Sequence, residues 1–233
     1  MLVMMLAGLG GVNLASTPLR QADPWIGTGS SHWRVDMDAT TQQSGRRMGP
    51  PGSENWHAML DGAEAILRDE GHAALTSRRV AEQIGVKQRL VYYYFRTMDE
   101  LIIETFKRLS ERELARLNQA RASAKPVREI WDVCIHTTDA RLVSQFMALA
   151  HRIEGLAKEV VHFVEESRRI QVEALTEAME RAGKKTRVTP AGLALLATSV
   201  ALALTREGQL GISAGHEDVR VLVDEFLAEL GEG

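Results

Sequence analysis

The chain has 233 residues, of which 45% are hydrophobic and 25% charged, and its formal net charge is -3 at pH 7. These values are typical of a globular protein with one large domain or two small ones. The single cysteine, Cys134, excludes an intramolecular disulfide and a cysteine-ligated metal cluster, which favours a reducing compartment such as the cytoplasm. The longest apolar run, residues 191–205, is too short to span a bilayer, so we expect no membrane partner.

The first 52 residues differ in composition from the rest of the chain. They contain four of the six prolines and eight of the nineteen glycines, and they show no sustained helical or strand periodicity. Their apolar start lacks the basic residues of a signal peptide, since the first basic residue is Arg20. We therefore expect residues 1–52 to form a disordered extension.

Helix signals follow one another from Ser53 onward. Apolar residues with helical spacing begin at Trp56, and Gly71 ends this first helix. Thr76 is suited to cap a short second helix that ends at Gly85, and a third helix is expected over 87–94. The sequence Thr-Met-Asp-Glu at 97–100 is a capping box, which predicts the start of a long fourth helix.

The rest of the chain also has the apolar spacing of helices, with no internal repeat and no convincing pair of strands. The sequence therefore predicts an all-α protein, divided into a unit at 53–98 and a second unit at 99–233. The further helices are expected near 127–138, 140–155, 157–182, 190–207 and 217–230.

Two short helices joined at Gly85 have the layout of a helix-turn-helix. Residues 76–96 carry five basic residues against one acidic residue, although the whole chain is acidic. Lys87, Gln88 and Arg89 stand at the start of the second of these helices, where long donors reach base edges. The alternative is a solvated basic face on a helical hairpin without specific binding.

The motifs LTSRRVAEQIGV, LVYYYF and MDEL resemble the DNA-binding domain of the tetracycline-repressor (TetR) family of bacterial transcription regulators. The resemblance is specific over 56–106 and general, in helix number and order, beyond it. It implies a three-helix DNA-binding domain joined by a long helix to a helical domain for effector binding and dimerisation. The DNA-contacting set that it implies is Ser77, Arg78, Lys87, Gln88, Arg89, Tyr92, Tyr93 and Thr97.

Two residues depart from the family pattern. Many members carry a small residue or glycine where this chain has Arg89, and a phosphate-binding lysine where it has Met98. The operator sequence therefore cannot be carried over from the family, and one phosphate contact is lost.

Two apolar stripes near the C-terminus suit helices that pair with their symmetry mates in a homodimer. The alternative is that both stripes face only the core of their own chain. The expected interface residues are Leu193, Leu196, Ala197, Val200, Ala201, Leu204, Val219, Leu222, Val223, Phe226, Leu227 and Leu230.

A pocket for the effector is expected to use large apolar and aromatic side chains of the middle helices, although such residues also build ordinary cores. His136, His151 and His162 lack the spacing of metal ligands, so no metal site is predicted. Glu165, Glu166, Arg168 and Arg169 are expected to form a solvated, paired face of one helix. The candidate pocket residues are Trp131, Ile135, Phe146, Met147, Leu149, His151, Phe163 and Val164.

These observations predict a homodimeric transcription regulator, a repressor that leaves a palindromic double-stranded DNA operator when a small-molecule effector binds. No catalytic signature or phosphate-binding loop is recognised, so neither an enzyme nor a cofactor is expected. Two alternatives remain. One is a regulator of the same fold that has no inducer or acts through a protein partner, and the other is a helical interaction module that does not bind DNA.

Overall fold

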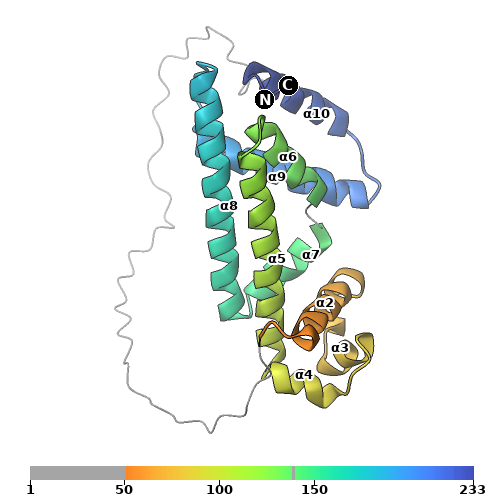
Figure 1. The fold of residues 1–233 in the computed structure, drawn as a ribbon. Coiled ribbons are helices and arrows are strands. Elements are labelled where there is room, and N and C mark those ends of the chain that lie inside the picture. The colour runs from red at the N-terminus through yellow and green to blue at the C-terminus, as the bar shows by residue number, and fades with distance from the viewer. Residues whose placement is uncertain (1–50, 138–139) are drawn as a thin grey trace, which may run out of the picture.

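The computed structural model describes residues 51–137 and 140–233, and the predicted extension over 1–52 lies almost wholly outside them. In the described residues every regular element is a helix, which confirms the all-α prediction. Figure 1 shows two long helices, α5 (Met98–Arg121) and α8 (Glu154–Arg181), running side by side. The helices α2 to α4 lie at one end of this pair, and α9 and α10 lie at the other.

The first end of the molecule is built from α2 (Glu54–Asp69), the short η1 (His72–Ala74), α3 (Ser77–Gln83) and α4 (Gln88–Tyr94). Their boundaries follow local chemistry. The hydroxyl of Thr76 accepts a hydrogen bond from the backbone N–H of Arg79 at 3.1 Å, so it caps α3 as predicted. Gly85, with φ of 71°, makes the turn into α4 in a conformation that other residues rarely adopt.

The predicted capping box opens α5. The Thr97 hydroxyl accepts from the N–H of Glu100 at 3.1 Å, and the Glu100 carboxylate accepts from the N–H of Arg96 at 2.7 Å. The second bond comes from the residue before the cap rather than from the cap itself, but it serves the same purpose of satisfying free N–H groups. The start of α5 is therefore fixed directly after α4.

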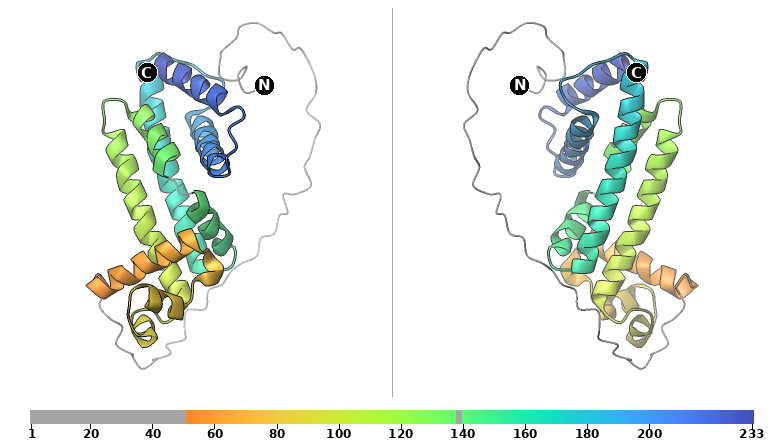
Figure 2. Two further views of the ribbon diagram at one scale, coloured as in Figure 1. Left: turned by 90° about the vertical axis from the view of Figure 1, so that its right-hand side faces the viewer. Right: turned by 90° about the vertical axis from the view of Figure 1, so that its left-hand side faces the viewer.

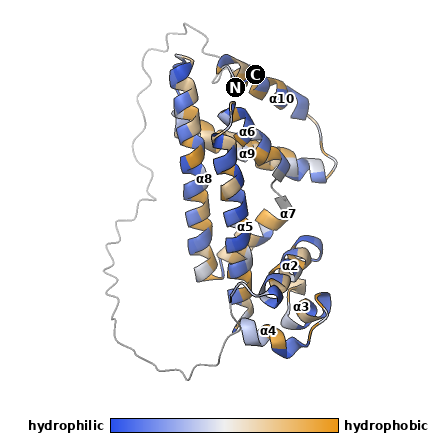
Figure 3. Ribbon diagram, in the orientation of Figure 1, coloured by the Kyte–Doolittle hydropathy of each residue, from blue (hydrophilic) through white to orange (hydrophobic). Residues whose placement is uncertain are grey.

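The remaining helices are α6 (Pro126–Thr137), α7 (Ala140–Ala150), α9 (Pro190–Gln209) and α10 (His216–Glu229). One predicted boundary is wrong. The helix expected over 140–155 ends at Ala150, and α8 begins at Glu154 instead of 157, because Ile153 is extended and turns its side chain into the core. Figure 3 shows hydrophobic and hydrophilic residues interspersed along each helix, as amphipathic helices require.

A first core fills the end that carries α2 to α4. It combines side chains of these helices with the first half of α5, the apolar face of α7 and the start of α8. Leu60 and Leu101, on either side of the predicted boundary at residue 98, are both fully buried in it. The first two turns of α5 are therefore packed as part of the same unit as α2 to α4.

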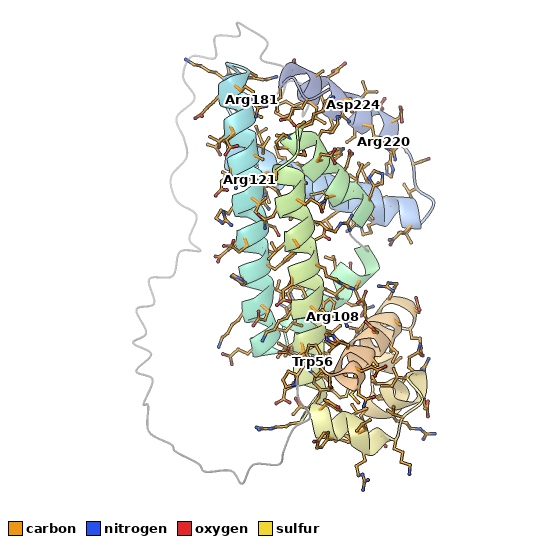
Figure 4. All side chains as sticks on the ribbon, viewed as in Figure 1. Trp56, Arg108, Arg121, Arg181, Arg220 and Asp224 are labelled. Atoms are coloured by element: carbon orange, nitrogen blue, oxygen red, sulfur yellow. The ribbon has the colours of Figure 1, made fainter. Side chains whose placement is uncertain are left out.

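Polar contacts also join this end to the rest of the molecule. Arg108 of α5 forms ion pairs with Asp61 at 2.8 Å and Glu64 at 3.4 Å, both on α2, and Figure 4 shows it at this junction. The Gln145 side-chain oxygen of α7 accepts from the N–H of His72 in η1 at 3.2 Å. Both α5 and α7 thus contact the α2–α4 unit.

Polar groups fasten α10 at both of its ends. At its start, the ring of His216 lies 3.0 Å from the Glu207 carboxylate of α9. After its end, the buried Glu232 carboxylate accepts from the N–H groups of Val127 at 2.6 Å and Arg128 at 3.1 Å. Glu232 therefore caps the first turn of α6 across the fold, and we call this contact the Glu232 clasp.

Candidate functional site

The surface formed by α3, α4 and the start of α5 presents the predicted DNA contacts at one end of the molecule (Figure 1). Val91 and Tyr94 point into the first core and hold α4 in place. The exposed side chains of the same segment include those of Lys87, Arg89, Tyr92 and Tyr93. The helix therefore presents a basic and tyrosine-rich face to solvent.

Ser77 has a different place from the other predicted contacts. It is buried at the start of α3, where its hydroxyl donates to the Tyr92 hydroxyl at 2.9 Å and accepts from the Gln88 side-chain amide at 2.9 Å. One buried hydroxyl thus joins α3 to two side chains on α4. This geometry orients Gln88 and Tyr92 relative to each other.

The basic residues of this surface fall into two groups. Arg78 is largely exposed and its Nε lies 2.8 Å from Glu82, whose hydrogen bond raises the pKa of Arg78. Arg79 forms a two-pronged pair with Glu70 and lowers the pKa of that carboxyl group, chiefly by hydrogen bonding. The side chains of Lys87, Arg89 and Arg96 have no carboxylate partner within the described ranges.

Thr97 lies at the edge of the same surface. Its hydroxyl oxygen accepts from the Glu100 N–H, while its own O–H is exposed and able to donate to a phosphate oxygen. The structure thus gathers α3, α4 and the cap of α5 at one end, with Ser77 directed inward and the other predicted side chains outward.

A second feature is an apolar cavity of about 110 Å³ between α6, α8, α9 and α10. Most of the residues predicted for the dimer interface surround it, which sequence periodicity alone did not indicate. Ala201 and Leu204 pack beside it against Trp131, and Leu230 packs with Leu193. The cavity is lined by Val127, Ile130, Trp131, Cys134, Gln171, Ala174, Leu175, Leu193, Ala194, Leu196, Ala197, Val200, Val219, Leu222, Val223, Phe226 and Leu227.

The residues predicted for the effector pocket are not brought together. Trp131 lines the cavity and Ile135 packs next to it, but the others lie elsewhere, because α7 turns its apolar face toward α2 and α5. Met147, His151 and Val164 are exposed, and Phe146, Leu149 and Phe163 belong to the first core.

One polar residue of α8 that lines the cavity was missed as a pocket residue. Gln171 is buried, lines the cavity, and accepts from the Thr198 hydroxyl at 3.0 Å. Ser167, one turn earlier, is also buried. The signal was present in the sequence, because two polar residues four positions apart lie on the inward side of an otherwise apolar helix face.

The predicted solvated face of α8 needs one correction. Arg169 is paired as expected, with Glu166 at 2.8 Å and Glu173 at 2.9 Å. Arg168 instead has a buried guanidinium nitrogen, Nη1, without a hydrogen-bond partner, because its position on the helix directs it toward α6. Burial lowers the pKa of Arg168.

Cys134 of α6 lies between charged neighbours. Burial, with a smaller contribution from Glu113, raises the pKa of its thiol to about 11, so the thiol stays protonated near neutral pH. Over 51–137 and 140–233 no three metal-ligating side chains form a group, and no helix is long and apolar enough to cross a bilayer.

Comparisons with known proteins match this geometry. Residues 59–105 match the family model described as bacterial regulatory proteins, tetR family. A TetR transcription regulator from Haloarcula marismortui is similar in structure, with a TM-score of 0.62 and 18% identity over 74% of this chain and 95% of that one. No curated protein sequence matches.

Two further solved structures share the fold at low identity. Salmonella enterica GusR has a TM-score of 0.58 and 16% identity, covering 78% of this chain and 98% of its own. Bacillus subtilis FadR, solved in complex with stearoyl-CoA, has a TM-score of 0.50 and 16% identity over 75% of this chain and 97% of that one.

Proposed function

We propose that this chain, whose residues 59–105 match the model for bacterial regulatory proteins of the tetR family, is a homodimeric repressor acting in the cytoplasm. Two copies of α4 enter successive major grooves of a palindromic operator, which requires them to lie about one DNA turn, ~34 Å, apart. A small molecule bound between the C-terminal helices changes this separation and releases the DNA. The observation that carries the proposal is the exposed basic and tyrosine-rich face of α4 at the end of the molecule.

The residues of this face have different roles in the proposal. Gln88 and Arg89 reach base edges from the first turn of α4, while Tyr92 and Tyr93 donate to phosphate oxygens further along. Lys87 adds charge, since no carboxylate of the described chain neutralises it. Ser77 positions Gln88 and Tyr92 rather than contacting DNA itself, because its hydroxyl is buried and occupied.

Dimerisation is proposed to use α9 and α10, the helices that carry the predicted stripes, through their exposed residues, because most of the stripe residues themselves surround the cavity within the chain. Both helices carry large exposed apolar side chains, including Leu195, which is 56% exposed, and Val221, which is 49% exposed. Such residues favour a partner surface over solvent. Packing of α9 and α10 against their symmetry mates forms a four-helix interface.

The proposed route from effector to DNA follows the long helices. The start of α5 is part of the first core, and its far end packs with α6 and α8 beside the cavity. The complex of FadR with stearoyl-CoA supports ligand binding by a protein of this fold. A ligand can shift the equilibrium only through different affinities for the two α4 spacings, and bound DNA must weaken ligand binding by the same factor.

A gel-shift titration tests the DNA-binding part. The wild-type protein is titrated onto promoter DNA flanking its own gene at low and moderate salt, because phosphate contacts make affinity fall with salt. Arg89→Ala is compared with Arg169→Ala, which removes an exposed arginine of α8, outside the proposed DNA and dimer surfaces. The expected loss for Arg89→Ala is roughly 1 to 3 kcal/mol of binding free energy, with no change for the control.

Selection of bound sites from random DNA separates base reading from phosphate binding. Gln88→Ala and Arg89→Ala should relax the selected motif at particular positions, while Tyr92→Phe should weaken all sites about equally. An unchanged motif for both alanine variants would refute the base-reading roles. Absence of binding even at low salt would favour a helical interaction module.

A further inference from the structure

The cavity between α6, α8, α9 and α10 has a lining without charge. Its lining residues in the described chain include no carboxylate, ammonium or guanidinium group. Burial raises the pKa of the Cys134 thiol to about 11, so this lining group is neutral near pH 7 as well. An ionised ligand would lose its hydration here without meeting a counter-charge, which is strongly unfavourable. The lining therefore favours uncharged molecules.

The size and polarity of the cavity also make water a poor occupant. A buried water molecule needs roughly two to four polar partners, whereas the polar side chains of the described lining are those of Trp131, Cys134 and Gln171. Apolar cavities of roughly 150 Å³ stay dry and bind benzene, and the cavity here measures about 110 Å³. It therefore has room for one aromatic ring with a small substituent.

Two aromatic side chains of the lining suit such a ring. Trp131 of α6 and Phe226 of α10 reach the cavity from different helices. Aromatic rings attract one another by more than their buried area alone provides. A ring that fills the cavity contacts α6 and α8 as well as α9 and α10, which are the helices proposed for dimerisation.

One polar group is available to a ligand in this apolar space. The Gln171 side chain is only 7% exposed, lines the cavity and has one hydrogen bond in the described chain, between its amide oxygen and the Thr198 hydroxyl at 3.0 Å. The amide nitrogen has no partner there, and it is not sealed within protein atoms either. Half of the amide is therefore open to a hydrogen bond from the cavity.

The Thr198 hydroxyl decides which half of the amide is open. Its oxygen also lies 2.9 Å from the Ala194 carbonyl oxygen, and its single hydrogen serves only one of these two acceptors at a time. When that hydrogen points to Ala194, the Gln171 amide turns over and donates to Thr198, which leaves its oxygen open instead of its nitrogen. A ligand hydroxyl group suits both arrangements, because it both donates and accepts.

We propose that this cavity binds a small uncharged hydroxylated aromatic molecule, of about the size of phenol, whose hydroxyl group forms a hydrogen bond with the Gln171 amide. The inference names the chemical class of the effector and rests on the proposed repressor function for its biological meaning. The ring is held by apolar and aromatic contacts, and the single polar contact fixes its orientation.

Calorimetry at pH 7 with the full-length protein and no DNA tests the proposal. The ligands are phenol, toluene, which has the same shape without the hydroxyl group, and benzoate, which carries an ionised carboxylate. Phenol and toluene should bind, and benzoate should bind at least about tenfold more weakly than phenol, because its charge has no partner in the lining.

A variant of Gln171 isolates the hydrogen bond. Gln171→Met keeps the length of the side chain and should weaken phenol binding by roughly five- to tenfold while leaving toluene binding unchanged. The matched control is Gln119→Met, which replaces an exposed glutamine of α5 and should change neither affinity. An equal loss for phenol and toluene in Gln171→Met would identify a structural role for Gln171 and overturn the proposal.

The single cysteine reports where the ligands bind. Cys134 lines the cavity, so a bound ring should shield its thiol from iodoacetamide. The alkylation rate should fall in proportion to the fraction of protein without ligand when phenol or toluene is added, and benzoate at the same concentration should have little effect. An alkylation rate that is unchanged at saturating phenol would place the ligand elsewhere and overturn the proposal.

Two other results would also overturn it. One is benzoate binding as tight as phenol binding, and the other is no detectable binding of phenol. Because these measurements contain no DNA, they succeed or fail independently of the repressor function. A protein that binds phenol through Gln171 but does not bind DNA would contradict only the proposed function, and DNA binding without phenol binding would contradict only this inference.

Discussion

The two ends of this molecule use the same kind of amphipathic helix with different results. At the α2–α4 end, Met59, Leu60 and Leu67 are completely buried in one continuous core. At the α9–α10 end, apolar side chains of equal size surround a cavity, and α10 is fastened by polar contacts at its two ends. The first end holds α4 on a filled core, whereas the second has a cavity and exposed apolar surface, where we propose that the effector and the partner subunit bind.

The largest expected effect compares a leucine in the filled first core with a leucine beside the cavity. Leu60→Ala should destabilise the protein by about 2 to 5 kcal/mol, because it leaves a new void in a filled core. Leu222→Ala, at the cavity, should cost clearly less, since Leu222 is only partly buried and lacks partner atoms on one side. Urea denaturation of both variants measures the difference, and equal losses would mean that the cavity is filled in solution.

A second effect concerns the fastening of α10. Glu232→Ala removes the acceptor of two backbone N–H groups of α6 and should destabilise the protein by about 1 to 3 kcal/mol. Glu217→Ala, which removes an exposed carboxylate on the first turn of α10, is the control and should change little. If both variants unfold at the same urea concentration as the wild type, α10 is held by its apolar face rather than by the Glu232 clasp.

A smaller effect depends on pH and reports the cost of burying the ionised carboxyl group of Glu113, near Cys134. Burial raises the pKa of Glu113 above its ordinary value of 4.5, so the folded state disfavours its ionised form. The resulting penalty is present above the folded pKa and disappears below 4.5, where the carboxyl group is protonated in both states. Glu113→Gln should therefore raise the melting temperature at pH 7 but not at acid pH.

The control for this prediction is Glu111→Gln, two residues earlier on the exposed side of α5. It should show no gain at pH 7. A gain for Glu113→Gln that persists unchanged at pH 4 and below would show that the amide packs better, and that the charge is not the cause.

The smallest effect leaves stability unchanged and reports on access to the cavity. Because the pKa of Cys134 is raised from 9.0 to about 11, its thiolate at pH 8 should be roughly 100-fold scarcer than that of an ordinary cysteine. Alkylation by iodoacetamide should be correspondingly slow and should accelerate as the pH approaches 11. A rate at pH 8 equal to that of a free thiol peptide would contradict this burial.

The sequence predicted the helices better than their packing. Thr76, Gly85 and Thr97 fix helix ends through local hydrogen bonds and backbone conformation, which depend on neighbours in the chain, and these predictions were confirmed. The predicted boundary between α7 and α8 was wrong at Ile153. The apolar side chain of Ile153 fits a helical pattern, although its backbone is extended.

The sequence was a poorer guide to which helices pack against each other. Periodicity shows which residues of a helix turn inward but not which neighbour they meet, so Phe146 and Phe163 were assigned to a pocket although they pack in the first core. In the same way, the stripe through Leu193 and Val200 suits a core, a cavity or a partner subunit equally well. Arg168 seemed to belong with Arg169, because adjacent charges in a helix are usually both solvated.

The hydroxyl of Ser77 has a consequence for the thermodynamics of recognition. Its hydrogen bonds to Gln88 and Tyr92 restrict the rotation of both side chains before any DNA is present. Ordering a long side chain at an interface costs about 0.5 to 1.5 kcal/mol of conformational entropy. In the proposed DNA complex, part of that entropy is lost when α3 and α4 fold together, before a base or phosphate meets Gln88 and Tyr92.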